Sequence, residues 1–164
     1  MLNHYLQYHI TVNVIKMTKK FIKNTIYIAS DHAGFVLKKY LILNLKKNKL
    51  EVIDLGTDSK EVSVDYPDFA KKMAEKIDEN SFGILICGSG IGIAISANRN
   101  KNIRAALCHN KISASLARGH NDANVICLGA RFLKQKYALA ICKTFLTKKF
   151  DGKRHIARVE KLGK

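Results

Sequence analysis

The sequence ILICGSGIG at residues 84–92 decides the fold. It begins with a continuous apolar run, as in a strand that is buried on both faces. It then carries glycines at alternate positions and leads into a stretch with helical spacing. A buried strand, a glycine turn and a helix in that order form the repeating unit of a parallel α/β sheet. We therefore expect the rest of the chain to alternate strands and helices.

That alternation extends in both directions from residues 84–92. Short apolar or β-branched runs predict strands at 26–29, 52–55, 82–87, 103–108 and 123–128. Helical spacing of apolar residues predicts helices at 35–48, 68–79, 91–98, 112–118 and 132–148. The pattern predicts an α/β fold, a Rossmann-like three-layer αβα sandwich with a five-stranded parallel sheet and right-handed crossovers. We expect one domain at 25–164 with a C-terminal helical segment, preceded by an N-terminal extension at 1–24.

The net charge of +16 suggests an anionic partner, which is a nucleic acid, a membrane surface or a metabolite. Most of the positive charge is lysine, spread in pairs along the predicted helices, as is typical of solvated helix faces. The six arginines are more informative, because a guanidinium binds phosphate in a bidentate manner. Arg131 follows the last predicted strand, and Arg154 and Arg158 share a helix face. We expect a bound phosphate, with no nucleic acid and no membrane as partner.

The four cysteines are Cys87, Cys108, Cys127 and Cys142, and no two of them form a C-x-x-C pair. No metal site is therefore expected. Three of the cysteines lie in apolar runs, which indicates buried, reduced thiols and a cytoplasmic protein. The first 24 residues lack the uninterrupted apolar run of a signal peptide, so we interpret them as an added arm or as sequence upstream of a natural start at Met17.

Cys87 is the cysteine with a different setting, because it ends a strand directly before a helix, where the thiolate is favoured. The glycines after it suit an anion, although Ile93 breaks the dinucleotide-binding pattern. The thiolate could act as a base, or as a nucleophile assisted by His32, His109 or His120. His32 closes the first strand, where a histidine is as often structural as functional. His120 lies in an expected turn at 119–121 beside short polar residues, which suits an acid–base group.

Five motifs, in this order, resemble the B-type ribose-5-phosphate isomerase family: SDHAGF at 30–35, DYPD at 65–68, ICGSGIG at 86–92, RGHNDANV at 118–125 and GKRHIARV at 152–159. The match spans about residues 25–162. The family includes galactose-6-phosphate and allose-6-phosphate isomerases on the same fold. The resemblance implies a phosphorylated sugar substrate, no cofactor, and a homodimer or homotetramer with active sites shared across the dimer interface.

The resemblance also implies roles for individual residues. Cys87 would be the base that moves a proton between C1 and C2 through an enediolate, Ser89 would assist in place of a threonine, and His120 would open the sugar ring. The absence of a glutamate near Ile93 favours the cysteine subtype. Asp31 would hold sugar hydroxyls, Tyr66 would line the pocket and Asn121 would contact the substrate. The anion hole would be formed by the backbone amides of Gly88, Gly90, Ile91 and Gly92. The phosphate would be bound by His32, Arg131, Arg154 and Arg158, some of them from the partner subunit.

These inferences lead to one function and three alternatives. The expected reaction is the interconversion of ribose 5-phosphate and ribulose 5-phosphate in the pentose phosphate pathway. A six-carbon sugar phosphate is the alternative within the family. A non-catalytic phosphate-binding or nucleic-acid-binding module and an inactive subunit of a hetero-oligomer are alternatives from other classes.

Overall fold

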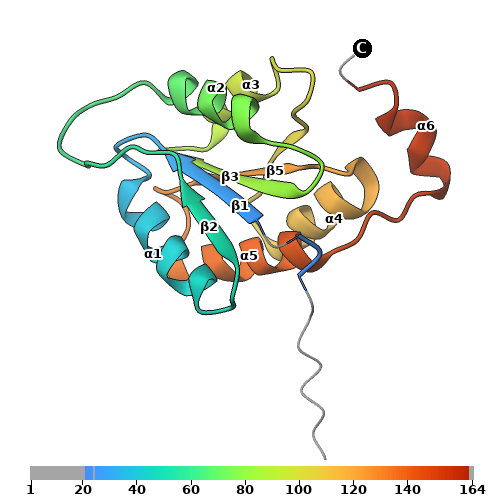
Figure 1. Ribbon diagram of the computed structural model, residues 1–164, viewed down its shortest axis with the longest axis horizontal. Coiled ribbons are helices and arrows are strands. Elements are labelled where there is room, and N and C mark those ends of the chain that lie inside the picture. Colours follow the sequence, from blue (N-terminus) through green and yellow to red (C-terminus); the bar gives the residue numbers. More distant parts are fainter. Residues whose placement is uncertain (1–20, 24, 163–164) are drawn as a thin grey trace, which may run out of the picture.

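The computed structural model, which describes residues 21–23 and 25–162, confirms the predicted α/β fold (Figure 1). The strands are β1 (Thr25–Ser30), β2 (Glu51–Asp54), β3 (Ser81–Cys87), β4 (Ala105–Leu107) and β5 (Val125–Gly129). The helices are α1 (Phe35–Lys46), α2 (Tyr66–Lys76), α3 (Ile91–Ala97), α4 (Lys111–Asn121), α5 (Gln135–Thr147) and α6 (Ile156–Val159), with a 3-10 turn η1 (Lys153–His155) before α6. All neighbouring strands are parallel, in the order β2-β1-β3-β5-β4.

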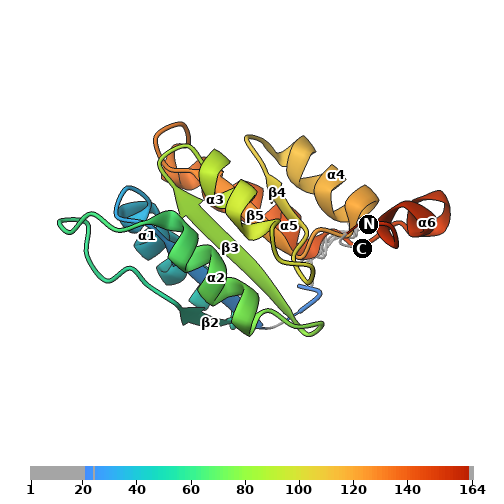
Figure 2. The same ribbon diagram turned by 90° about the horizontal axis from the view of Figure 1, so that it is seen from above.

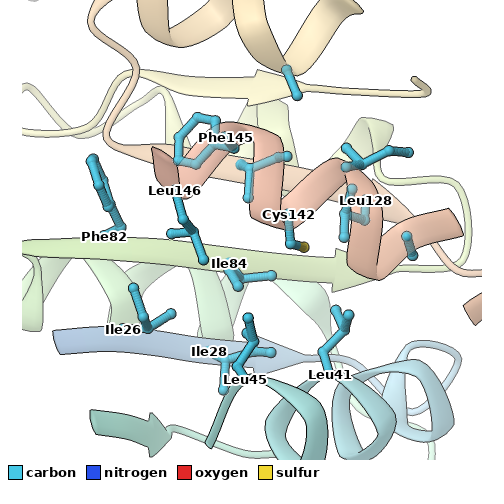
Figure 3. Close-up of a cluster of buried hydrophobic side chains, with 14 of the residues drawn as sticks. Ile26, Ile28, Leu41, Leu45, Phe82, Ile84, Leu128, Cys142, Phe145 and Leu146 are labelled. Atoms are coloured by element: carbon cyan, nitrogen blue, oxygen red, sulfur yellow. The ribbon is translucent and has the colours of Figure 1, made fainter. Parts of the chain in front are cut away.

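Helices cover both faces of the sheet, as Figures 1 and 2 show. Helices α1, α4 and α5 pack on one face, where Phe82 of β3 meets Phe145 of α5 with ring centroids 5.5 Å apart (Figure 3). Helices α2 and α3 pack on the other face. Phe69 and Met73 lie on the buried side of α2, and Ile77, directly after the helix, is buried with them. Full burial of each such side chain contributes roughly 1.5–3 kcal/mol.

The predicted extension at 1–24 lies outside the described residues, apart from 21–23. Those three residues already contact the domain. The N–H of Ile22 donates a hydrogen bond of 3.2 Å to the carbonyl of Leu146, and Phe21 packs against the core. In the described part of the chain, no helix combines the length and apolar character that a bilayer crossing requires.

The prediction of a turn at 119–121 is wrong, because α4 continues through Asn121. Gly119 is buried inside the helix, and a Cβ there would lie 2.7 Å from Cε of Lys148 and 2.8 Å from Oδ2 of Asp151. The missing side chain therefore makes room for the segment that follows α5. The helix ends at Asp122, which adopts a left-handed conformation with φ of 46°.

The predicted C-terminal helical segment is short. A bend precedes it, since Gly152 and Lys153 have positive φ of 62° and 52°. After that bend the chain forms only η1 and the four-residue helix α6. Figure 2 shows this segment beside the end of α4, beyond the edge of the sheet.

Candidate active site

Cys87 is the last residue of β3, which lies between β1 and β5 in the middle of the sheet. The residue is only 4% exposed. The N–H of Gly90 donates a hydrogen bond to its sulfur, with a nitrogen–sulfur distance of 3.0 Å. An N–H aimed at sulfur stabilises the thiolate, which is the form that removes protons. The turn after β3 therefore suits Cys87 as a base.

The other three cysteines have settings that keep their thiols protonated. Burial raises the pKa of the Cys108 thiol to about 11. Burial also raises the pKa of Cys127 and of Cys142, and both residues are fully enclosed in the core. The prediction that these three residues are core thiols is confirmed.

The turn at 88–90 is built on close backbone contacts. Gly90 has φ of 79°, and a Cβ there would lie 2.8 Å from the carbonyl carbon of Leu128. Only glycine fits both the conformation and the space. Ser89 is half-buried, and its Oγ accepts a hydrogen bond of 3.2 Å from the N–H of Ile91. Two of the amides predicted for the anion hole, those of Gly90 and Ile91, are thus already bonded within the turn.

Tyr66 and Arg131 lie against this turn from two sides. A Cβ on Gly92 would lie 2.6 Å from the Tyr66 ring, so that ring packs directly on the start of α3. A Cβ on Gly88 would lie 3.0 Å from the central carbon of the Arg131 guanidinium. The N–H of Arg131 also donates a 3.0 Å hydrogen bond to the carbonyl of Gly88. The structure therefore places an aromatic ring and an exposed cation beside Cys87.

Asp31 and His32 follow β1, whose last residue pairs with Ile86 of β3. The carboxylate of Asp31 is buried and accepts a 2.9 Å hydrogen bond from the N–H of Gly34. The Nδ1 atom of His32 accepts a 3.2 Å hydrogen bond from the N–H of Val64. In the neutral ring, the proton therefore lies on Nε2, which has no hydrogen-bond partner among the described residues and can donate to a ligand. Asp31, His32, Tyr66, Arg131 and residues 87–92 form what we call the carboxyl-edge cluster.

His120 lies in the last turn of α4, and its ring stacks on the ring of His155. The centroids are 4.3 Å apart and the ring planes differ by 12°. Asp151 lies nearby, since its N–H donates a 2.9 Å hydrogen bond to the carbonyl of Gly119. A hydrogen bond from Lys148 is the main reason that the pKa of Asp151 is lowered.

Two of the predicted phosphate ligands, Arg154 and Arg158, belong to the same region. Both are exposed, and the Arg158 guanidinium donates a 3.1 Å hydrogen bond to the carbonyl of Arg154. His155 was not among the site residues expected from the sequence. Its position directly after Arg154 in the GKRHIARV motif is the signal that could have found it. His120, Asn121, Arg154, His155 and Arg158 form what we call the histidine–arginine cluster.

The two clusters lie at opposite ends of the strands within one chain: the carboxyl-edge cluster at their carboxyl ends and the histidine–arginine cluster towards their amino ends. Helix α4 starts beyond the carboxyl end of β4 and runs back along the sheet. Its 11 residues span roughly 16 Å at about 1.5 Å per residue. The structure thus brings the carboxyl-edge residues together, and it does not bring His120 to Cys87.

A parallel α/β sheet that presents a cysteine, an imidazole and a guanidinium at its carboxyl edge has the arrangement of an enzyme for small molecules. The particular family follows from the sequence. The family model described as Ribose/Galactose Isomerase matches residues 26–162. The chain belongs to this family, which confirms the resemblance carried by the five motifs.

Individual relatives agree with this assignment. Ribose 5-phosphate isomerase B from Anaplasma phagocytophilum is 47% identical with a TM-score of 0.85, over 87% of this chain and 99% of that one. The Mycoplasma genitalium enzyme, solved with bound ribulose-5-phosphate, is 42% identical with a TM-score of 0.81, over 84% and 92% of the two chains. Ribose-5-phosphate isomerase B of Escherichia coli K12 is 43% identical over 132 residues, which is 79% of this chain and 88% of that one.

Proposed function

We propose that this protein interconverts ribose 5-phosphate and ribulose 5-phosphate through an enediolate, with Cys87 as the base. The observation that carries the proposal is the hydrogen bond that the N–H of Gly90 donates to the sulfur of Cys87. The same turn carries Ser89 and packs against Arg131. Relatives that are similar over most of their length bear the name of this activity. A bound ribulose-5-phosphate in the Mycoplasma genitalium structure supports the same substrate.

The proposed chemistry is a proton shuttle. The Cys87 thiolate removes the proton from C2 of the open-chain sugar and returns it to C1, with Ser89 relaying the hydroxyl proton. Negative charge develops on the enediolate oxygen, where backbone N–H groups of the turn stabilise it most. Phosphate bound by Arg131 and by Nε2 of His32 holds the reacting carbons in place. The atoms balance without a metal, a nucleotide or a redox partner.

Ring opening by His120 requires a second chain in this proposal, because His120 and Cys87 lie at opposite ends of the strands in one chain. A pentose phosphate is shorter than the span of α4. The partner's histidine–arginine cluster would therefore complete the carboxyl-edge cluster, with Arg154 and Arg158 adding to the phosphate site.

The surface around β4 supports such a dimer. This strand is at one edge of the sheet, and exposed apolar side chains flank it on α3 and α4, namely Ile91, Ile95, Ile112 and Leu116. A pocket of 580 Å³ lies on the α4 side and reaches Asn121, and one of 460 Å³ lies on the α3 side and reaches Ile91. The surface along this edge strand therefore adjoins both clusters. A two-fold axis through it would exchange them between subunits.

The test is the formation of ribulose 5-phosphate from ribose 5-phosphate by purified protein in excess chelator, beside allose 6-phosphate and galactose 6-phosphate. Turnover of the pentose supports the proposal. Turnover of a hexose phosphate alone would move the substrate to the six-carbon alternatives. Absence of turnover with a dimer of the expected mass would favour a non-catalytic protein. A cytoplasmic location stays a prediction from the reduced cysteines.

A further inference from the structure

Lys38 is a fully buried lysine in the first turn of α1. Lysine is almost never buried unless it is paired. Here the ammonium donates to the carboxylate of Asp54, at the end of β2, and to the carbonyl of Thr57 at 2.8 Å. The same carboxylate oxygen accepts a 3.0 Å hydrogen bond from the N–H of Gly56. One ion pair thus joins α1, β2 and the start of the loop at 55–65.

The loop segment held by Lys38 is bonded in turn to the end of β1. The N–H of Ser30 donates to the carbonyl of Gly56, and the N–H of Thr57 donates to the carbonyl of Ser30, both at 2.8 Å. Ser30 directly precedes Asp31 and His32. Through Gly56 and Thr57, the Lys38 ammonium therefore fixes Ser30, the residue directly before the proposed substrate ligands.

The far end of the same loop reaches the same turn. Among the hydrogen bonds of the described residues, one joins residues 58–64 to the rest of the molecule, and it is the 3.2 Å bond from the N–H of Val64 to Nδ1 of His32. The loop therefore touches the β1 turn at both ends. Its first end is fixed by Lys38, and its second end sets which nitrogen of His32 carries the proton.

Stability alone does not explain this buried charge. Replacing a buried ion pair with apolar groups is often neutral or stabilising, so the pair is better explained by what it orients. We propose that Lys38 is a positioning residue for the phosphate-binding turn: by fixing the loop at 55–65 against Ser30, it holds His32 with its Nε2–H directed to the substrate phosphate. The inference rests on the proposed function, because it takes His32 as a phosphate ligand.

The experiment compares Lys38→Met with Lys39→Met, which changes the exposed neighbour on the same helix. In Lys38→Met we expect the KM for ribose 5-phosphate to rise on the order of tenfold, the scale of one charge-assisted hydrogen bond, with kcat changed by less than about twofold. The ¹⁵N spectrum of His32 should change from a single Nε2–H tautomer to a mixture. Lys39→Met should leave both unchanged.

The outcomes separate this inference from the proposed function. A wild-type protein without turnover would overturn the function, whereas the ¹⁵N spectrum would still report on Lys38. Unchanged KM and an unchanged His32 tautomer in a folded Lys38→Met variant would overturn the positioning role. If that variant does not fold, Asp54→Asn replaces it, since Asp54 is partly exposed and can be hydrated. This variant should raise KM in the same direction, and an unchanged KM would equally overturn the inference.

Discussion

The imidazole rings of His120 and His155 are stacked face to face, with centroids 4.3 Å apart. Two protonated rings at this separation repel each other. Desolvation lowers the pKa of His155, and the charges of His120, Arg154 and Arg158 lower it further. Near neutral pH, His155 is therefore a neutral ring, and the His120 ring stacks against it. The pair links the end of α4 to the segment that carries the arginines.

The first prediction concerns the pH dependence of stability. The pKa of His155 is lower in the folded chain than in the unfolded chain, where it is about 6.5. As the pH falls from about 6.5 to the lower pKa of the folded chain, the unfolded chain binds a proton that the folded chain does not, so the free energy of unfolding decreases over that range. Urea unfolding at about pH 7.5 and about pH 5.5 should show a smaller decrease for His155→Gln than for the wild type. His109→Gln, at an exposed site, serves as the control. An equal decrease in the free energy of unfolding between the two pH values in all three proteins would contradict the prediction.

Replacement of Cys87 by alanine should remove turnover and preserve binding. Loss of a general base typically lowers kcat by about 100- to 10,000-fold. Substrate affinity should stay near the wild-type value, because the phosphate is bound elsewhere. The measurement is kcat by a ribulose 5-phosphate assay together with the Kd by calorimetry. Cys142→Ala, a buried thiol in α5, is the matched control and should keep kcat. A Cys87→Ala variant with near-normal kcat would show that another group is the base.

Arg154→Ala should act mainly on KM. Its guanidinium is exposed and carries no structural ion pair among the described residues, so its loss should leave stability nearly unchanged. Loss of one charge-assisted contact to phosphate should raise KM on the order of tenfold. Lys153→Ala removes a neighbouring positive charge and controls for general attraction of the anionic substrate. Equal increases in KM for both variants would point to that general attraction instead of a specific phosphate contact.

Gly90→Ala should destabilise the protein more than Gly92→Ala. At Gly90 the methyl group meets backbone atoms of Leu128 and Gly129 at 2.8–2.9 Å, and φ is positive. We expect a loss of more than about 2 kcal/mol in the free energy of unfolding. At Gly92 the three atoms nearest to the methyl group all belong to the end of the Tyr66 side chain, which can move, so the loss should be under about 1 kcal/mol. Urea titrations of both variants give the comparison, and similar losses would contradict it.

The fold was predictable because the apolar runs are continuous and the helical stripes are regular. The carboxyl-edge cluster was predictable as well, because the residues that follow parallel strands all lie at the carboxyl ends of those strands. Gly119 shows where that reasoning fails. A glycine followed by short polar residues indicates a turn from local preference, yet here the missing side chain makes room for Lys148 and Asp151. That contact joins residues about 30 positions apart, which local preference does not report.

The stacked ring of His155 was missed for the same physical reason. Its partner His120 is distant in sequence, and only the return of the chain after α5 brings them together. The separation of His120 from Cys87 is also a property of the fold, because it depends on the direction and length of α4. Motifs predict which residues take part in the site, and the fold decides which of them one chain can bring together.

The final prediction uses that separation. If each active site takes Cys87 from one subunit and His120 from the partner subunit, Cys87→Ala and His120→Asn are each inactive as homodimers. A mixed dimer, however, has one site with both residues intact. Equal amounts of the two variants, unfolded and refolded together, should give about a quarter of the wild-type activity, since roughly half of the dimers are mixed and each has one working site of two.

Two further measurements make this result decisive. Each variant refolded alone should stay inactive, which excludes recovery by refolding itself. Mass spectrometry of differently tagged subunits should show that mixed dimers form. If mixed dimers are present and the activity stays at the level of the parents, then Cys87 and His120 do not share a site across two chains. In that case His120 acts only through the packing of α4 against the segment that carries Arg154, and the ring-opening group must lie in the carboxyl-edge cluster, where His32 is the remaining imidazole.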